Sequence, residues 1–383
     1  MTKKDMEKII SKYINNEASV SEIDGLSKWL DKKENLKIFK EYLTIHHTLN
    51  SDLIFDSLAA YENFSNKDTS TKKARKLFLT PIFKYAAAIL IFVSAGYFFL
   101  TKDKPVKDNT PIIVNNKIKI GTDKATLTLS EGSSINLEKG KKYTTDNLNS
   151  NGEEIIYNSQ PATSPKIAYN YLTIPRGGQF SVKLSDGTQI WLNSESQIKY
   201  PVAFIKGQTR EVELIYGEAY FDVTSSTKHH GAKFKVAHNM QEVEVLGTEF
   251  NIKAYQDEVH VYTTLVEGKV GVSNGAETVV LKPKEQSIVG DSKDIETKNI
   301  DIYNEISWRE GVFSFEGKSL KSIMKVLSRW YDMDVTFNNA ELEDVRFIGV
   351  LGKEQKIEEI LNTITDLGFI NSYEINNKKI VLK

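Results

Sequence analysis

Apolar residues recur at helical spacing along residues 1–66. They stand three or four positions apart, as they do along one face of an α-helix, and the pattern restarts four times. The groups are Ile9, Ile10, Tyr13 and Ile14; Ile23, Leu26, Trp29 and Leu30; Leu36, Phe39 and Leu43; and Ile54, Leu58 and Tyr61. The pattern predicts a small all-α domain of four short helices. Because a domain of this size buries little apolar surface, a partner that completes its core is expected.

A basic linker at residues 67–81 leads to a segment of different character. Between residues 82 and 100 the only charged side chain is Lys84, which stands near the edge. A helix of this length would measure about 29 Å, close to the thickness of the hydrocarbon core of a bilayer. The segment therefore predicts one transmembrane helix, followed by a linker at residues 101–111. Its representative residues are Tyr85, Ala88, Ile91, Gly96 and Leu100.

The charges on either side of this segment predict its orientation. Lysine and arginine are enriched before it, whereas the lysines after it are mixed with aspartates. Positive charge next to a membrane span favours the cytoplasmic side. We therefore expect a single-pass protein of the inner membrane, with a cytoplasmic N-terminus and a periplasmic C-terminus.

Residues 112–300 show short alternating runs cut by glycine and by Asn or Asp turns, which predicts an all-β domain. Two segments in this range share one frame. Leu129, Ser130, Gly132, Ile135 and Leu137 of the first match Leu184, Ser185, Gly187, Ile190 and Leu192 of the second. Each copy is typical of a hairpin with a tight turn at its glycine. Recurring hairpins favour a sandwich or a solenoid-like stack over a closed barrel.

The last segment, residues 308–383, reads strand, helix, strand twice. The apolar faces of the two helices superpose, with spacing i, i+3, i+4 and i+7 in both. They are formed by Leu320, Ile323, Met324 and Leu327, and by Ile357, Ile360, Leu361 and Ile364. The pattern predicts a small α+β domain of duplicated split βαβ type. Gly368 is expected to end the second helix, and Asn376–Asn377 to form the turn of a closing hairpin.

Composition removes several classes of function. The chain has 50 basic and 51 acidic residues, so no global field favours direct binding of nucleic acid. It has no cysteine, which excludes disulfides, thiolate metal sites and cysteine nucleophiles. Its six histidines form no metal-binding pattern. We therefore expect no cofactor and no metal, and a protein that is not an enzyme in the ordinary sense.

Several sequence blocks resemble a known family. They are PRGGQFSVKLSDGTQIWLNSESQIKYP, VELIYGEAYFDV, VEVLGTEFNIKAY and LVEGKVGV, which cover most of residues 174–289. Together and in this order they resemble the FecR family of membrane-anchored sigma-factor regulators. The segment IISKYINNEASVSEIDGLSKWL resembles the cytoplasmic anti-sigma segment of that family. The C-terminal domain is similar to the signalling domain of TonB-dependent outer-membrane transporters.

The resemblance implies partners on both sides of a membrane. The N-terminal helices would bind an extracytoplasmic-function sigma factor, with Ile23, Leu26, Trp29, Leu30 and Phe39 as candidate contacts. The periplasmic part would respond to the signalling domain of a TonB-dependent transporter, and we expect regulated proteolysis to release the sigma factor. The sequence leaves open the sign of the regulation, the oligomeric state and the identities of sigma factor, transporter and ligand.

Two further hypotheses stay open. The resemblance places Gly247–Thr248 on a step at which some relatives cleave their own backbone, by attack of the threonine hydroxyl on the glycine carbonyl. A glycine that merely makes a bulge or turn is the alternative at this position. As an alternative function, the chain could be a membrane-tethered module that binds periplasmic carbohydrate or cell-wall polymer without control of a sigma factor.

Overall fold

The computed structural model describes residues 9, 25, 26, 29, 111–145, 148–157, 167–290, 292 and 294–383. The chain divides into two compact units, residues 1–108 and residues 109–383. Within the first unit, Ile9, Gly25, Leu26 and Trp29 are helical, and the side chains of Ile9 and Leu26 are buried. The second unit contains a β domain (residues 122–299) and an α+β domain (residues 303–382).

The fold class predicted from the sequence is wrong. It began with a small all-α domain and a transmembrane helix, whereas the residues that the structure describes form mostly strands and few helices. Among the residues that the structure describes, no helix combines the length and the apolar character that crossing a membrane requires. Apart from the four helical positions named above, residues 1–66 and 82–100 lie outside the described ranges. Apolar spacing shows which face a helix would bury, but helical stability comes mostly from the surface against which that face packs.

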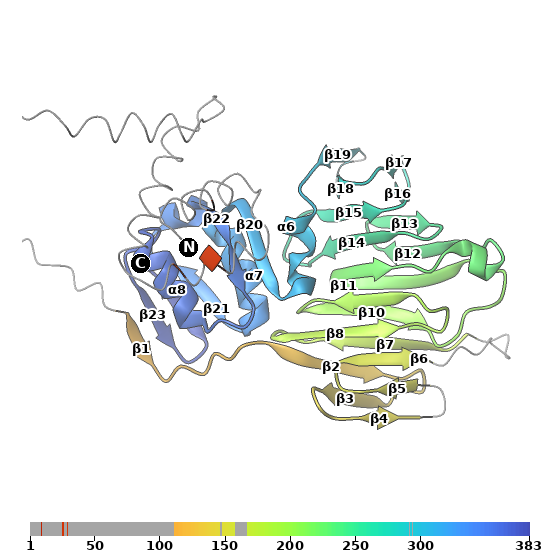
Figure 1. The fold of residues 1–383 in the computed structure, drawn as a ribbon, viewed down its shortest axis with the longest axis horizontal. Helices are drawn as coiled ribbons and strands as arrows, with labels where there is room; N and C mark the ends of the chain where they lie inside the picture. Colours follow the sequence, from red (N-terminus) through yellow and green to blue (C-terminus); the bar gives the residue numbers. More distant parts are fainter. Residues whose placement is uncertain are drawn as a thin grey trace, which may run out of the picture. The chain divides into compact units, whose positions relative to one another are not determined.

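The β domain is a continuous stack of paired strands, drawn from yellow to cyan in Figure 1. Its elements are β2 (Thr122–Thr128), β3 (Ser134–Glu138), β4 (Tyr143–Thr144), β5 (Leu148–Ser150), β6 (Glu154–Tyr157), β7 (Tyr169–Ile174), β8 (Gly178–Lys183), β9 (Gln189–Leu192), β10 (Ser196–Pro201), β11 (Arg210–Asp222), η2 (Ser226–His229), β12 (Phe234–His238), β13 (Gln241–Val245), β14 (Glu249–Ala254), β15 (Val261–Glu267), β16 (Val270–Ser273), β17 (Thr278–Leu281), β18 (Glu285–Val289) and β19 (Ile295–Asn299).

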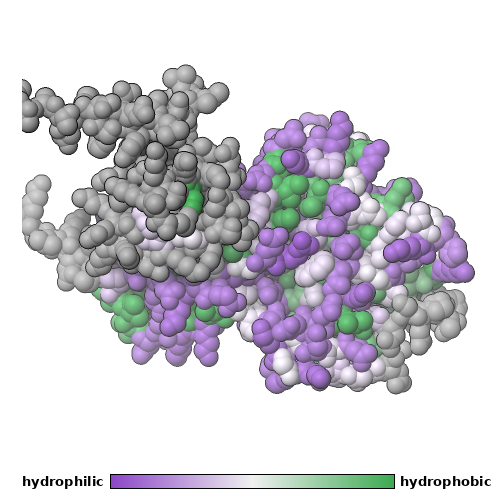
Figure 2. All heavy atoms as spheres, in the orientation of Figure 1, coloured by the Kyte–Doolittle hydropathy of each residue, from purple (hydrophilic) through white to green (hydrophobic). Residues whose placement is uncertain are grey.

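The long strand β11 joins the two layers of this stack. Its first half pairs with β10 and β12, and its second half pairs with β9 and β14. Alternate residues point inward, as in β13, where every second side chain is buried. The inward side chains form one apolar core along the domain. Figure 2 shows the visible surface of this domain as mainly hydrophilic, with apolar residues in small groups.

The two predicted hairpin copies are confirmed. The first is formed by β2 and β3, and the second by β8 and β9. Their turns share one hydrogen-bond pattern: Leu129 N–H donates to the Ser133 carbonyl, and Leu184 N–H donates to the Thr188 carbonyl. The two turn glycines have φ values of +94° and +86°. The repeated sequence frame therefore specifies a repeated local structure.

The α+β domain places its two longer helices, α7 and α8, against two small sheets. Its elements are α6 (Tyr303–Ile306), η3 (Ser307–Glu310), β20 (Val312–Ser319), α7 (Leu320–Tyr331), β21 (Asp334–Phe337), η4 (Ala340–Asp344), β22 (Arg346–Gly352), α8 (Ile357–Asp366), β23 (Tyr373–Asn376) and β24 (Lys379–Leu382). Strands β20 and β22 pair with each other, while β21, β24 and β23 lie in the second sheet. The predicted apolar faces of α7 and α8 are buried in the core of this domain.

The predicted ends of the last elements are confirmed in position. Gly368 follows α8 with φ +77° and donates its N–H to the Thr365 carbonyl. Asn377, with φ +56°, forms the turn between β23 and β24. The strand β1 (Ile112–Val114) differs from expectation, because it pairs in parallel with β23 instead of entering the β domain. The fourth strand of the C-terminal sheet thus comes from the start of the unit, as Figure 1 shows.

One buried ion pair distinguishes the second hairpin from the first. Arg210 Nη1 lies 2.7 Å from Asp186 Oδ2, and both side chains are 2% exposed. The guanidinium also donates to the Thr224 hydroxyl and to the carbonyls of Thr224 and Ala232. The residue that corresponds to Asp186 in the first hairpin is Glu131, which is exposed. The two copies therefore differ in the environment of this turn carboxylate, which is buried and paired with an arginine in the second copy and exposed in the first.

We expect Asp186→Ala to lower the free energy of unfolding by about 3–5 kcal/mol, because it leaves the Arg210 charge buried without its partner. The matched substitution in the other copy, Glu131→Ala, should change it by less than about 0.5 kcal/mol. Urea denaturation of residues 109–383 measures both values. Equal effects of the two substitutions would contradict the assignment of the ion pair to the core.

Candidate functional site

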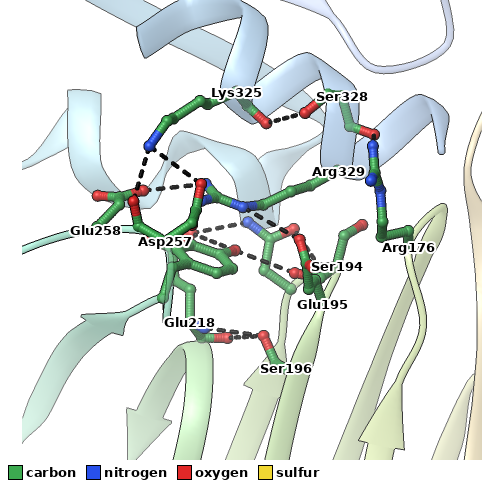
Figure 3. A network of polar contacts seen from close by, with 12 residues as sticks. Arg176, Ser194, Glu195, Ser196, Glu218, Asp257, Glu258, Lys325, Ser328 and Arg329 are labelled. Carbon is green, nitrogen blue, oxygen red and sulfur yellow. Dashed lines mark hydrogen bonds and ion pairs between the residues drawn. The ribbon is translucent and has the colours of Figure 1, made fainter. Parts of the chain in front are cut away.

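The β domain caps the C-terminal end of helix α7, which belongs to the α+β domain. The turn between β7 and β8 carries Arg176 and Gly177. Gly177 N–H donates to the Arg329 carbonyl at 2.7 Å, and Arg176 Nη2 donates to the Ser328 carbonyl at 3.0 Å and to the Met333 carbonyl. The last carbonyls of a helix have no partner within the helix itself. Here the β domain supplies hydrogen-bond donors for these carbonyls, as Figure 3 shows for Arg176.

The Arg329 side chain leaves the same helix end in the opposite direction and meets three carboxylates. Its guanidinium pairs with Asp257, with Glu258 at 3.1 Å and with Glu195 at 3.4 Å. The guanidinium carbon lies 3.6 Å from the centre of the Tyr255 ring. All four partners belong to loops of the β domain, and the Arg329 side chain is only 5% exposed. Figure 3 shows this cluster at the boundary between the domains.

The cations in this cluster change the pKa of a neighbouring carboxyl group. Burial alone would raise the pKa of Asp257, but the neighbouring Arg329 and Lys325 cations lower it below its usual range. Lys325 Nζ lies 3.1 Å from Asp257 and comes from the helical turn before Arg329. Successive turns of α7 therefore present two cations to one acidic loop. Such an arrangement fixes the rotation of the helix about its axis as well as its position.

A buried glutamate lies beneath the cluster. The Glu218 carboxylate accepts hydrogen bonds from Asn193 at 2.9 Å and from Asn251 at 3.0 Å. The Tyr255 hydroxyl donates to the Ser194 carbonyl at 3.2 Å, so this tyrosine connects the strand ends around Glu218 with the cation above its ring. Burial raises the pKa of Glu218. The polar network therefore continues from the domain boundary into the β stack.

Lys353 is a second buried cation at the boundary. It follows β22 and lies among aromatic side chains, with Nζ 3.8 Å from the centre of the Trp330 ring. Nζ donates to Gln179 Oε1 at 2.6 Å and to the Trp308 carbonyl at 3.3 Å. Gln179 belongs to β8, so this contact also joins the two domains. Burial lowers the pKa of Lys353 to about 7.

These contacts hold helix α7 in a fixed position against the β domain. Helix α7 is held at its carbonyls, at Arg329 and, through Trp330, at Lys353. Separating the two partners of a buried ion pair is energetically unfavourable, because each charge would remain desolvated without its partner. Among the described residues, no group of His, Asp or Glu side chains is arranged to hold a metal ion. The arrangement couples the two domains to each other.

The candidate cleavage step lies between β13 and β14. Gly247 has φ +142°, and a Cβ at this position would lie 2.7 Å from the Ser225 Cα atom. Only glycine fits such a conformation and such an approach. The Thr248 hydroxyl is buried and donates to the Lys269 carbonyl at 3.0 Å. A carbonyl accepts a hydrogen bond but is no general base, so the geometry combines backbone strain with an unactivated hydroxyl.

The other predicted site residues lie mostly outside the described ranges. Of the candidate sigma-factor contacts, Leu26 is buried and helical, and Trp29 is helical and half-buried. Ile23, Leu30 and Phe39 lie outside the described residues, as do Tyr85, Ala88, Ile91, Gly96 and Leu100. These assignments stay predictions.

The sequence does not predict the contacts across the domain boundary. Arg176 stands in the PRGG block and Arg329 in the block LSRWYDM, and the sequence pattern assigns a role to neither residue. Both are single basic residues in polar turns or on helix faces, where surface exposure is the usual expectation. The one available signal was Arg329 beside Trp330 at the end of an amphipathic helix, where a cation near the last carbonyls is favourable.

The burial of Lys353 predicts a pH dependence of stability. Its pKa is about 7 in the folded protein and about 10.4 in an unfolded chain, so the unfolded chain binds more protons between these values. The free energy of unfolding should therefore rise with pH across this window. Relative to Lys353→Met, the rise should approach about 1.4 kcal/mol per pH unit above pH 7.

Urea denaturation of residues 109–383 at several pH values between about 7 and 9 checks this prediction. Lys353→Arg serves as a control, because its guanidinium stays charged throughout and should destabilise the protein at every pH. Parallel pH profiles for the unmodified protein and Lys353→Met would contradict the prediction.

The Gly247–Thr248 step has a direct test. Thr248→Ala removes the only nucleophile of the mechanism, so a fragment that begins at residue 248 should disappear, whereas Thr248→Ser should keep it. The alanine variant should also lose about 1 kcal/mol of unfolding free energy, because the Lys269 carbonyl loses its donor. Mass spectrometry of fragment N-termini measures the first effect. A fragment that persists in Thr248→Ala would exclude the mechanism.

Comparisons with known proteins give the family. The sequence model described as FecR protein matches residues 170–271, and the model described as FecR, C-terminal, matches residues 312–382. No curated protein matches the chain. Two crystal structures of a candidate anti-sigma factor from Parabacteroides distasonis, at 1.65 Å and 2.50 Å resolution, share 30% sequence identity with it.

Each of these structures superposes with a TM-score of 0.50 over 56% of this chain and 98% of the other chain. The family matches fall on the β domain from β7 into β16 and on the α+β domain from β20 to β24, the two domains that Arg176 and Arg329 join. With both matches present, and with the relative covered over nearly its whole length, the chain belongs to the FecR family.

Proposed function

We propose that this chain controls an extracytoplasmic-function sigma factor through its N-terminal unit, in response to a signal received by residues 109–383. The observation that carries the proposal is the match to a candidate anti-sigma factor over 98% of that protein's chain. The helical positions Leu26 and Trp29 support it, because a half-buried tryptophan one turn after a buried leucine leaves part of a large aromatic side chain accessible at the edge of a packed helix face.

The proposal includes a location and a second partner. We place the chain at the inner membrane, with residues 1–66 in the cytoplasm and the β and α+β domains in the periplasm. The partner there would be the signalling domain of a TonB-dependent outer-membrane transporter. An α+β domain with sheet edges suits such a partner, since strand addition at an edge is a common mode of recognition.

Release by regulated proteolysis is the third part of the proposal. Arg176, Arg329 and Lys353 hold the two C-terminal domains together as one body. A signal received there must reach the N-terminal unit through the chain that joins the two units. Cutting that chain would separate the units without requiring it to transmit a force.

We expect the full chain to co-purify with an extracytoplasmic-function sigma factor from the same cell and to bind it saturably at a one-to-one ratio. Trp29→Ala should weaken binding by about 2 kcal/mol, or roughly thirtyfold in Kd, because a partly exposed tryptophan is a typical interface anchor. Isothermal titration with the purified sigma factor measures the change.

Two control variants separate binding from folding. Glu131→Ala changes an exposed residue of the β domain and should bind the sigma factor as the unmodified chain does. Leu26→Ala removes a buried side chain, and should lower the helical circular dichroism signal as well as the affinity. If the unmodified chain binds no extracytoplasmic-function sigma factor of its cell, the proposed function fails.

A further inference from the structure

The edge of the C-terminal sheet is closed by a strand that comes from the other end of the unit. In β1, Ile112 pairs with Glu374, Ile113 with Ile375, and Val114 with Asn376. The pairing is extended on one side, where Asn377 N–H donates to the Val114 carbonyl and Lys117 N–H donates to the Asn377 carbonyl. The α+β domain is therefore completed by the first described residues of the unit.

This strand contributes little to the core beneath it. Ile112, Ile113 and Val114 are 52%, 48% and 47% exposed, whereas Ile375 and Ile380 on the neighbouring strands are almost fully buried. None of the three is a buried member of the apolar cluster of the domain. Figure 2 shows apolar surface at the place where Figure 1 draws β1. The backbone ladder with β23 is consequently the main attachment of β1.

The residues that follow β1 are held more firmly. Ile118 and Ile120 pack against the core of the α+β domain, and Asn116 Nδ2 donates to Glu358 at 2.5 Å. Gly121 lies directly against Trp330, since a Cβ at this position would be 2.6 Å from the indole ring. We call residues 112–121 the strap. Its first part is attached mainly by the β1 ladder, and its second part is anchored at the domain boundary.

We propose that β1 is an exchangeable strand, and that the β23 edge which it covers is the docking edge for an extended segment of the periplasmic partner. The inference rests on the proposed function and specifies how that partner binds. Exchange replaces one set of backbone hydrogen bonds by an equal set, so it requires little net free energy. Because the core and the anchored part of the strap remain in place, the domain keeps its fold while β1 leaves.

The present occupant shows what the partner segment must look like. It must run parallel to β23, as β1 does. It must be short and uncharged, and its residues should be β-branched and apolar, like Ile112, Ile113 and Val114. Beside it, the Glu374 carboxylate is already paired with Lys383, which neutralises one charge that could otherwise attract a basic strand.

Strand exchange would also lengthen the free segment of chain that precedes the anchored part of the strap. Releasing residues 112–115 adds four residues to the segment that precedes the anchored part of the strap. An extended chain gains at most about 3.3–3.6 Å per residue, so about 14 Å of backbone becomes available. Freed backbone of this kind is a preferred substrate for proteases.

A disulfide that locks β1 onto β23 tests the proposal. The chain has no cysteine, so Val114→Cys with Asn376→Cys introduces the only two thiols. The two residues are register partners, and both side chains are exposed, so the substitutions remove little packing. The full-length double variant is expressed with its sigma factor and transporter, and a sigma-dependent reporter is read with the cross-link oxidised and reduced.

With the cross-link oxidised, reporter induction should fall at least about tenfold, since a cross-link that stabilises the paired strand by about 1.4 kcal/mol lowers the released population tenfold. Reduction should restore induction, and each single cysteine variant should respond normally. A control disulfide, Thr126→Cys with Asn136→Cys, joins β2 to β3 away from the strap and should leave induction unchanged.

Three outcomes would overturn the proposal. A response of the locked protein equal to that of the unmodified chain excludes strand exchange and leaves the proposed function intact. Absence of any response from the unmodified chain removes the proposed function, and the inference with it. A disulfide-linked dimer formed by Val114→Cys of one molecule and Asn376→Cys of another would identify a second copy of the chain as the occupant of the edge.

Discussion

The capping of helix α7 by a turn of the β domain is the interaction on which the arrangement of the second unit depends. Arg176 and Gly177 donate to carbonyls at the end of the helix, where a helix needs partners from outside itself. Their donors set the position of the helix end to within a hydrogen-bond length. From that end, Arg329 reaches the acidic loops and Trp330 reaches both Lys353 and the strap. A single helical turn thus organises three separate contacts.

The buried charges around this turn explain why the boundary behaves as one unit. Arg329, Lys353 and Glu218 are each buried, and each is satisfied by groups from both domains or from the strand ends at the boundary. Buried ion pairs contribute little net stability compared with apolar packing, but breaking one by removing a partner is strongly unfavourable. Separating the two domains would expose several of these buried charges to solvent or leave them without partners at the same time. The charges therefore act as constraints on geometry more than as sources of stability.

The sequence predicts the periodic parts of this structure and misses the parts that depend on distant contacts. The paired hairpins and the faces of α7 and α8 follow from spacing, because period and turn residues are local properties. Arg176 meets Ser328, and Ile112 meets Glu374, only because the chain folds back on itself. An isolated arginine or a run of three apolar residues carries no information about such a partner. The predicted fold class is corrected for a different reason, since the described residues are mostly strands and include no helix that could cross a membrane.

The many contacts between the two C-terminal domains also limit how a signal could pass from them to the N-terminal unit. If the two C-terminal domains turned against each other, Arg329 would lose three carboxylates and α7 would lose donors at its end. A rearrangement of that size would leave several buried charges without their partners at the same time, which is strongly unfavourable. The strap is different, because its first three side chains are half exposed and are not buried members of the core. It is also continuous with the residues that lead to the N-terminal unit, so a change at β23 can reach that chain without disturbing either domain.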